Sequence, residues 1–431
     1  MNQKDLLEVE AFIYGTKIGI LIMHKDRIYF EYDKAFIAKG IEISPLKLNT
    51  KHIDVPYTNK ENFEIYRGMP GVFFDSLPDK HGMPFIYRYF EQKGFLASDV
   101  TLLHKLTFIA DRGLGAIEYK PKEEQKFHQI KDIISAKNLH EDMRKILEKD
   151  QQNYSIDRLM NIIDSASPVG GARPKMLISY NKDTKQIKYN NKILDKGYKR
   201  AIIKFDEVYP DKDLVDRSID LTNLEYIYMC LAKECGINTS IVHLHQEDSQ
   251  NHLVIERFDR DEQDNKIHVC SASGLMHKDI SVANVMSYEE LFSFTNKICN
   301  KQSDVKELYR RMVFNALSFN VDDHAKNFEF MMNKYGEWFL SPAFDITYSK
   351  GTVKAHITSI HGKNENFYIE DFLSIAQKNL ISEKEALEII NIISTKLLKF
   401  GQRARELNID KNTIQKCEEN IKFQRNLLKF A

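Results

Sequence analysis

Residues 320–346 (NVDDHAKNFEFMMNKYGEWFLSPAFDI) constrain the fold of this chain more than any other segment. Asp322 stands five positions before Asn327, and Asp345 follows later among apolar neighbours. Between them, apolar residues alternate with polar ones on either side of a turn-forming stretch, a pattern that predicts a β-hairpin over 328–340. Because a hairpin brings its two ends together, we expect Asn327 and Asp345 to meet at one site.

This order of residues is the one that protein kinases use for phosphoryl transfer. It predicts that Asp322 is the catalytic base, which accepts the proton of the attacking hydroxyl, and that Asn327 and Asp345 hold Mg²⁺ against the phosphates of ATP. An Asp framed by apolar residues is expected to be buried and to need a partner, which favours a site over a solvated acidic loop. A metal-hydrolase site made of Asp322, Asp323 and His324 is disfavoured, because adjacent residues rarely point at one ion.

The length and the charge balance limit the classes of protein to which this chain can belong. The chain has 431 residues, enough for two or three domains. Lys plus Arg equals Asp plus Glu at 62 each, which argues against a protein that binds nucleic acid through bulk charge, although a local basic patch stays open.

The cysteines and the hydropathy pattern indicate a compartment. The five cysteines form no C-x-x-C pair and no metal-ligand spacing, so we expect thiols in a reducing compartment. The opening MNQKDLLEVEAF is too polar for a signal peptide, and no apolar run approaches the ~18 residues of a membrane span. We expect a soluble, cytoplasmic protein with no membrane partner.

Apolar periodicity predicts a β-rich beginning, a mixed middle and a helical end. Short antiparallel strands are expected over 8–33, and the charged segment 122–155 is expected to be a solvated helix pair that links two halves. Three domains follow, at 1–125, 126–258 and 259–431. The second half predicts strands at 175–180, 187–193, 201–206, 239–245 and 252–258, and helices at 222–236, 383–400 and 411–429.

Two residues of the middle domain have the positions of further kinase parts. Lys204, in the predicted strand AIIKFD, would grip the α and β phosphates; alternatively, it points outward from an edge strand. Glu225, on the following helix, would pair with that lysine; alternatively, Thr222 and Glu225 form a capping box at the helix N-terminus.

A small-residue loop, SASPVGGARPK (165–175), precedes the first predicted strand of the middle domain. The backbone N–H groups of Gly170 and Gly171 can approach a phosphate there, and Lys175 can neutralise its charge. The loop matches neither G-x-G-x-x-G nor the Walker pattern, so alone it is a weak signal.

Taken together, these segments resemble the HipA family, which comprises Ser/Thr kinases that act as the toxins of bacterial toxin–antitoxin pairs. The combination of GGARPK, ERFDR and D-x-HAKNF is specific, and the resemblance spans almost the whole chain. The matching segments, in the family's order, are RGMPGVFFDSLPDKHG (67–82), LTFIADRGLGAIEYKP (106–121), SPVGGARPK (167–175), AIIKFD (201–206), NLEYIYMCLAKECGI (223–237), LVIERFDR (253–260), DDHAKNFEF (322–330) and LSPAFDITYS (340–349).

The resemblance implies an α+β, protein-kinase-like fold of two lobes: a mixed β N-lobe and a mostly helical C-lobe, with an N-terminal β-rich HipA-type subdomain. It implies an ATP- and Mg²⁺-dependent protein Ser/Thr kinase with Asp322 as its catalytic residue. Backbone groups at Glu256 and Phe258 would hold adenine at the hinge. The other implied site residues are Lys204, Gly170, Gly171, Lys175 and Glu225 for the nucleotide, and Asn327 and Asp345 for the metal.

Members of the family also autophosphorylate a serine just before the phosphate loop, which ejects the loop and abolishes ATP binding. Here Pro168 stands in or beside that place, so Ser165 and Ser167 are the candidates for such self-inactivation. Asn320 and Val321 replace the His and Arg of ordinary kinases, so activation through a paired activation-loop phosphate is not expected.

The resemblance also implies partners. A small HipB-like helix-turn-helix antitoxin would carry the DNA-binding function, and the chain would reach DNA only through it. The protein substrate would be a translation factor such as an aminoacyl-tRNA synthetase. Two alternatives stay open: a small-molecule phosphotransferase, since those enzymes share Asp-x-x-x-x-Asn, and a non-catalytic co-repressor that works with a DNA-binding protein.

Overall fold

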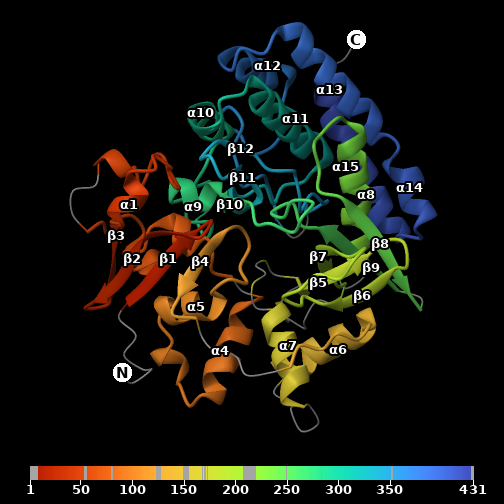
Figure 1. Cartoon of the computed structure of the whole chain (residues 1–431). Coiled ribbons are helices and arrows are strands. Elements are labelled where there is room, and N and C mark those ends of the chain that lie inside the picture. Colours follow the sequence, from red (N-terminus) through yellow and green to blue (C-terminus); the bar gives the residue numbers. More distant parts are fainter. Residues whose placement is uncertain are drawn as a thin grey trace.

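The computed structural model describes most of the chain and arranges it around three β-sheets (Figure 1). Among the described helices, none is long and apolar enough to cross a membrane. The five cysteines are free thiols. The described residues are 8–52, 56–78, 81–122, 128–148, 155–166, 168, 171, 173–206, 220–248, 250–282, 284–350 and 353–428.

The N-terminal subdomain is built on a four-stranded antiparallel sheet of order β3-β2-β1-β4, at the left of Figure 1. Alternate residues of the first strand, Val9, Ala11 and Ile13, are buried, as the apolar alternation predicted. Its strands are β1 (Glu8–Ile13), β2 (Thr16–His24), β3 (Arg27–Tyr32) and β4 (Ile117–Lys120). The helices between β3 and β4 are α1 (Lys34–Ile37), α2 (Phe63–Tyr66), α3 (Gly71–Phe74), α4 (Met83–Gln92) and α5 (Leu102–Ile109).

A five-stranded antiparallel sheet of order β6-β5-β7-β9-β8 forms the β lobe. Helices α6 and α7 lie on one side of it and α8 on the other (Figure 1). The strands occur where the alternation predicted them, because β-branched and aromatic residues face both layers of helices. The elements are α6 (Ala136–Leu147), α7 (Ile156–Ala166), β5 (Lys175–Asn181), β6 (Gln186–Tyr189), β7 (Lys199–Lys204), α8 (Leu221–Glu234), β8 (Val242–Glu247) and β9 (Gln250–Glu256).

The segment 122–155 is not the solvated helix pair that its composition suggested. It contains α6, whose apolar face is buried at Leu139, Met143 and Ile146 in the core beneath the sheet. Because the outward face of α6 carries many charged residues, the composition of the segment alone does not reveal the buried apolar stripe. Helix α4 joins the same core through Phe85, so packing continues across the expected boundary at residue 125.

The C-terminal part is mostly helical, as predicted, around a small sheet of order β10-β11-β12. The predicted hairpin is present as β11 and β12, with Phe330 opposite Leu340. The elements are β10 (His268–Ser271), α9 (Ala272–Met276), α10 (Tyr288–Ile298), α11 (Gln302–Ser318), β11 (Glu329–Met332), β12 (Trp338–Leu340), α12 (Ile369–Lys378), α13 (Glu383–Leu397), α14 (Phe400–Glu406) and α15 (Lys411–Leu427).

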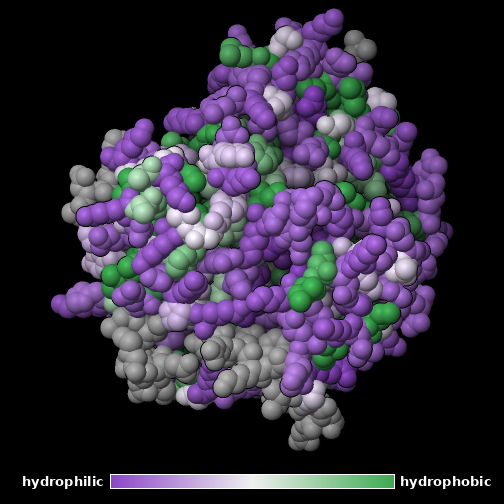
Figure 2. Space-filling model, viewed as in Figure 1, coloured by the Kyte–Doolittle hydropathy of each residue, from purple (hydrophilic) through white to green (hydrophobic). Residues whose placement is uncertain are grey.

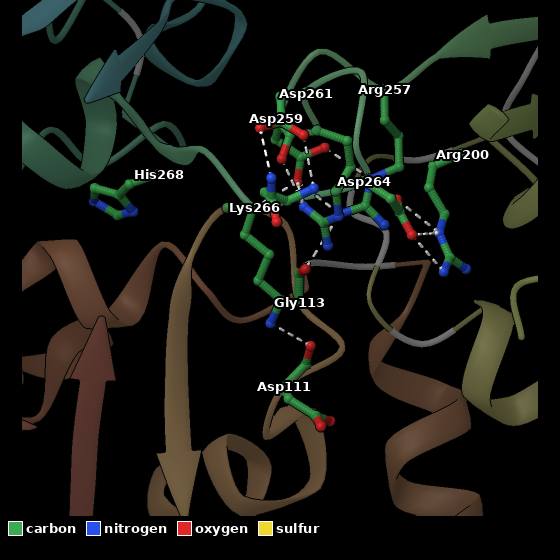
Figure 3. Close-up of polar contacts among 12 residues, drawn as sticks. Asp111, Gly113, Arg200, Arg257, Asp259, Asp261, Asp264, Lys266 and His268 are labelled. Carbon is green, nitrogen blue, oxygen red and sulfur yellow. Dashed lines mark hydrogen bonds and ion pairs between the residues drawn. The ribbon is translucent and has the colours of Figure 1, made fainter. Parts of the chain in front are cut away.

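An ion-pair network joins the N-terminal subdomain to the chain that leaves β9 (Figure 3). Arg257 donates to both carboxylate oxygens of Asp259, at 2.8 and 2.6 Å. Asp259 also accepts from the Gly115 N–H at 2.7 Å, and Arg257 donates to the Gly113 carbonyl at 3.3 Å. Burial alone would raise the pKa of Asp259, but the guanidinium groups of Arg257 and Arg260 hold it well below its usual range.

The surface is mixed in character. On the face shown in Figure 2, hydrophilic side chains dominate and hydrophobic ones gather only in small separate patches.

Candidate active site

Lys204 lies at the end of β7 and joins the two lobes. Its Nζ atom is 2.7 Å from Glu225 Oε1 on α8 and 2.6 Å from Asp345 Oδ1 in the C-terminal part. Glu225 is completely buried. Burial opposes the charge on Lys204, but the carboxylates of Asp345 and Glu225 outweigh it and raise the lysine pKa.

The structure distinguishes between the alternatives that the sequence left open for Lys204 and for Glu225. Strand β7 lies in the middle of its sheet, so Lys204 is not an outward residue of an edge strand. Helix α8 is capped by Asp220, whose side chain accepts from the Asn223 N–H, so Glu225 does not serve as its N-terminal cap. Lys204 and Glu225 therefore pair as the kinase motif predicted.

Arg173 is a further charged residue at this site, which the sequence interpretation left without a role. Its Nη1 lies 2.9 Å from Glu225 Oε2, so Glu225 divides its two oxygens between Arg173 and Lys204. Its Nη2 lies 3.9 Å from Asp206, a residue whose pKa burial raises to about 6. The available signal was the arginine of the GGARPK motif, which stands two positions before the lysine and shortly after two glycines.

Gly171 and Lys175 lie together at the start of β5. Gly171 has φ +98°, a conformation that side chains disfavour, and a Cβ there would lie 2.2 Å from Lys175 Nζ. The lysine end could move aside, so it is the positive φ that favours glycine at this position. Lys175 on β5 lies opposite Lys204 on β7 in the strand register, so both lysines are at the same end of the sheet. Gly170 lies outside the described residues.

The predicted catalytic Asp322 lies in the loop after α11. Its N–H donates to Ser349 Oγ at 3.0 Å, and its carbonyl accepts from Asn327 Nδ2 at 2.8 Å. Its side chain is 45% exposed, with Oδ1 4.0 Å from His324 Nε2. Burial raises the carboxyl pKa, His324 opposes the shift, and the nearby carboxylate of Asp345 adds to it. The backbone of Asp322 is therefore held by hydrogen bonds at both its N–H and its carbonyl.

Asp323, the adjacent carboxylate, has a different environment. It is 1% exposed and accepts hydrogen bonds from Tyr288 Oη (3.2 Å), His356 Nδ1 (2.9 Å) and the backbone N–H groups of Ile357 (2.9 Å) and Thr358 (3.1 Å). Three of these four hydrogen bonds hold the later segment 356–358, and the fourth comes from α10. Among the described residues, no group of three or more His, Cys, Asp or Glu side chains could bind a metal ion.

Asn327 and Asp345 fit the requirements of Mg²⁺. Because Asn327 Nδ2 is engaged by the Asp322 carbonyl, its Oδ1 is the atom suited to a metal. The Asp345 side chain is 33% exposed, so it is only partly buried where its apolar neighbours predicted burial, and the expected partner is Lys204. One carboxylate and one amide oxygen, completed by phosphates and water, suit Mg²⁺. Asp345 has φ +55°, a strained value of the kind that concentrates at functional sites.

The predicted hinge residues lie at the end of β9. The Glu256 side chain is paired with His243 Nε2 at 2.7 Å, and its N–H donates to the Ile241 carbonyl. The Phe258 ring lies 5.7 Å from the Phe344 ring, and both are partly exposed. The groups of this segment that suit a flat heterocycle are its backbone and the two apolar rings. The Glu256 carboxylate is already paired with His243.

The two candidate phosphorylation sites differ. Ser165 belongs to α7 and is only 2% exposed, so a kinase could reach its hydroxyl only after the end of the helix had unwound. Ser167 lies outside the described residues.

Two protein-family models match successive parts of the chain. The model of the HipA N-terminal domain matches residues 9–120, and that of the HipA-like C-terminal domain matches residues 167–399. The serine/threonine-protein kinase toxin HipA of Shewanella oneidensis is 26% identical over 188 residues, 39% of this chain and 40% of the relative. A putative kinase of Haemophilus influenzae is 29% identical over 141 residues, 29% of this chain and 40% of the relative. The matches thus span well under half of each relative.

Among solved structures, HipA of Shewanella oneidensis, in its complex with HipB and operator DNA, matches with a TM-score of 0.66. The match covers 97% of both chains at 17% sequence identity. It establishes a shared fold over nearly the whole length, including the N-terminal sheet.

Proposed function

This chain belongs to the HipA family, and from that premise we propose that it is an ATP- and Mg²⁺-dependent protein Ser/Thr kinase, the toxin of a HipA/HipB-like pair. The observation that carries the proposal is the contact of Lys204 with both Glu225 and Asp345. It brings the proposed phosphate-binding lysine of one lobe beside the proposed metal-binding aspartate of the other, and kinases need both groups in place for phosphoryl transfer.

The residues divide the chemistry between them. Asp322 would orient the acceptor hydroxyl and take its proton, with its backbone held by Ser349 and Asn327. Lys204 and Lys175 would hold the phosphates by charge. Mg²⁺, held by Asn327 and Asp345 when bound, would neutralise the charge of the phosphate oxygens.

The proposal includes a partner. The solved relative was obtained with HipB and operator DNA, and the present chain has zero net charge. We therefore assign DNA binding to a small HipB-like helix-turn-helix antitoxin and not to this chain. The family resemblance adds a translation factor, such as an aminoacyl-tRNA synthetase, as the candidate substrate. Co-expression with genomic neighbours followed by pull-down tests the partner; sequence-specific DNA binding by the chain alone would contradict it.

Self-inactivation by a serine near the phosphate loop is a further part of the proposal. Since Ser165 is buried in α7, Ser167 is the candidate we favour. Intact mass after incubation with Mg-ATP, followed by mapping of the tryptic segment, tests it. A fully active protein that gains no phosphate in this segment would exclude self-inactivation here.

The kinase activity itself is tested with a cell lysate and Mg-ATP, followed by phosphosite mass spectrometry. Wild-type protein should phosphorylate a small set of proteins on Ser or Thr, and Asp322→Asn should not. If small metabolites gain phosphate while no protein does, the small-molecule phosphotransferase is the better description. If neither gains phosphate although the protein is folded and binds Mg-ATP, the proposed activity is wrong.

A further inference from the structure

We infer that the N-terminal subdomain holds the phosphate loop from both ends, with His81 and Arg112 as positioning residues for nucleotide binding. The phosphate loop here means residues 167–175. The inference rests on the proposed function, because it assigns the loop to nucleotide. It goes further by giving a role in nucleotide affinity to a subdomain that supplies none of the proposed catalytic or metal residues.

His81 holds the end of the loop that leads into β5. Its backbone N–H donates to the Gly171 carbonyl at 3.1 Å. Its Nε2 atom lies 3.0 Å from the Lys175 carbonyl and 3.3 Å from the Lys175 N–H. The side chain is buried, with its ring against Phe85 at the start of α4. One histidine thus binds the backbone on both sides of the segment that carries Arg173.

Arg112 holds the end of α7 that leads into the loop. Its Nε lies 2.7 Å from Asp164 Oδ1, and each side chain is only 11% exposed. The guanidinium also covers the Phe108 ring at 4.8 Å. Burial raises the pKa of Asp164, and the charges of Arg112 and Lys122 oppose that shift.

The segment that carries Arg112 is itself held in place. Arg257, within the hinge segment, donates to the Gly113 carbonyl (Figure 3). Asp259, just after the hinge, accepts from the Gly115 N–H. A continuous set of buried polar contacts therefore runs from the hinge, through residues 112–115, to the entrance of the phosphate loop. One segment of the N-terminal subdomain thus contacts both the hinge segment and the end of α7.

Anchors of this kind matter because a loose loop loses conformational entropy when it closes on a ligand. A loop already held at both ends loses less, so the nucleotide binds more tightly. Removal of one anchor should weaken nucleotide binding and raise the KM for ATP roughly tenfold, the size expected for one buried hydrogen-bonded contact. It should leave kcat nearly unchanged, since Asp322 and its supports lie elsewhere.

The test compares His81→Ala, His81→Gln and Arg112→Gln with wild type in the full-length protein. His24→Ala is the matched control, since His24 is an exposed histidine of the same subdomain. Two quantities are measured: amide hydrogen exchange over residues 160–178 without nucleotide, and affinity for a non-hydrolysable ATP analogue with Mg²⁺. His81→Gln keeps a side-chain nitrogen donor, so it should recover part of the lost affinity.

Faster exchange over 160–178 in His81→Ala and Arg112→Gln, together with weaker analogue binding and no change in His24→Ala, would support the inference. Unchanged exchange and unchanged affinity in both variants would overturn it. If His81→Ala does not fold, Arg112→Gln and His81→Gln decide by the same two measurements. A wild-type protein that binds no nucleotide would instead reject the proposed function, while the exchange data would still report on the anchors alone.

Discussion

Lys204 and Asp345, 141 positions apart in the chain, form an ion pair of 2.6 Å between the β lobe and the helical part. Burial alone would raise the pKa of Asp345, but Lys204, with Lys175 and Arg173 nearby, holds it well below its usual range. The carboxylate is therefore charged at neutral pH and ready to bind a cation.

Asp345→Ala should abolish the Mg²⁺-dependent part of ATP binding. The substitution removes a proposed metal ligand, while Lys204 keeps Glu225 as its partner and the fold is retained. Calorimetry with Mg-ATP, and with ATP in excess EDTA, separates the metal-dependent part of the affinity from the rest. Equal Mg-ATP affinity in wild type and variant would remove Asp345 from the metal site.

Asp322→Asn should keep nucleotide binding and lose phosphoryl transfer by roughly 10²- to 10⁴-fold, the usual contribution of a general base. Its side chain is 45% exposed, so stability should change little. Asp323→Asn is the matched control: its buried carboxylate accepts several hydrogen bonds, so this variant should melt at a clearly lower temperature. Near wild-type transfer by a folded Asp322→Asn protein would place the base elsewhere.

The activity should fall on acidification at a higher pH than for an ordinary aspartate. A base must be deprotonated to act, and burial together with the Asp345 charge raises the pKa of Asp322. The profile of kcat/KM against pH reports the free enzyme. Because His324 lowers this pKa, His324→Gln should move the acidic limb to still higher pH. A limb that moves to lower pH in this variant would contradict the assignment.

Glu225→Gln should destabilise the fold by roughly 3–5 kcal/mol, the cost of breaking a buried ion pair. The change leaves two cations, Lys204 and Arg173, side by side without their shared carboxylate. Adding Arg173→Gln removes one of the two charges, so the double variant should recover part of the loss. Urea unfolding of both single variants and the double variant gives the coupling; strictly additive effects would mean that Arg173 and Glu225 do not interact.

The protein should lose stability as the pH falls from about 6.5 towards 4, partly through His252. This histidine is buried, neither ring nitrogen has a hydrogen-bond partner among the described residues, and burial lowers its pKa to about 4. In that window the unfolded chain binds the proton and the folded chain does not, so the free energy of unfolding decreases by up to roughly 3 kcal/mol. His252→Leu should flatten this part of the stability profile measured by urea unfolding. An unchanged slope would mean that His252 titrates normally.

Much of the architecture could be predicted because local patterns carry it. The alternation in residues 8–33 and the hairpin over 328–340 depend on a period of two and on turn chemistry, both of which are local. Helix α6 was misjudged for the opposite reason. Its buried stripe is defined by a sheet and by α4, and neither is visible from the charged composition of the segment itself.

The sequence by itself determined which residue types were available for chemistry, and in what order. The spacing from Asp322 to Asn327 and the hairpin before Asp345 are properties of the chain. Only the tertiary structure decided that Glu225 is a partner of Lys204 and not a helix cap, that Asp323 is held by hydrogen bonds from its neighbours, and that Arg173 shares the same carboxylate. The physical reason is that burial and distance set the state of a charge, and both depend on segments far apart in the sequence.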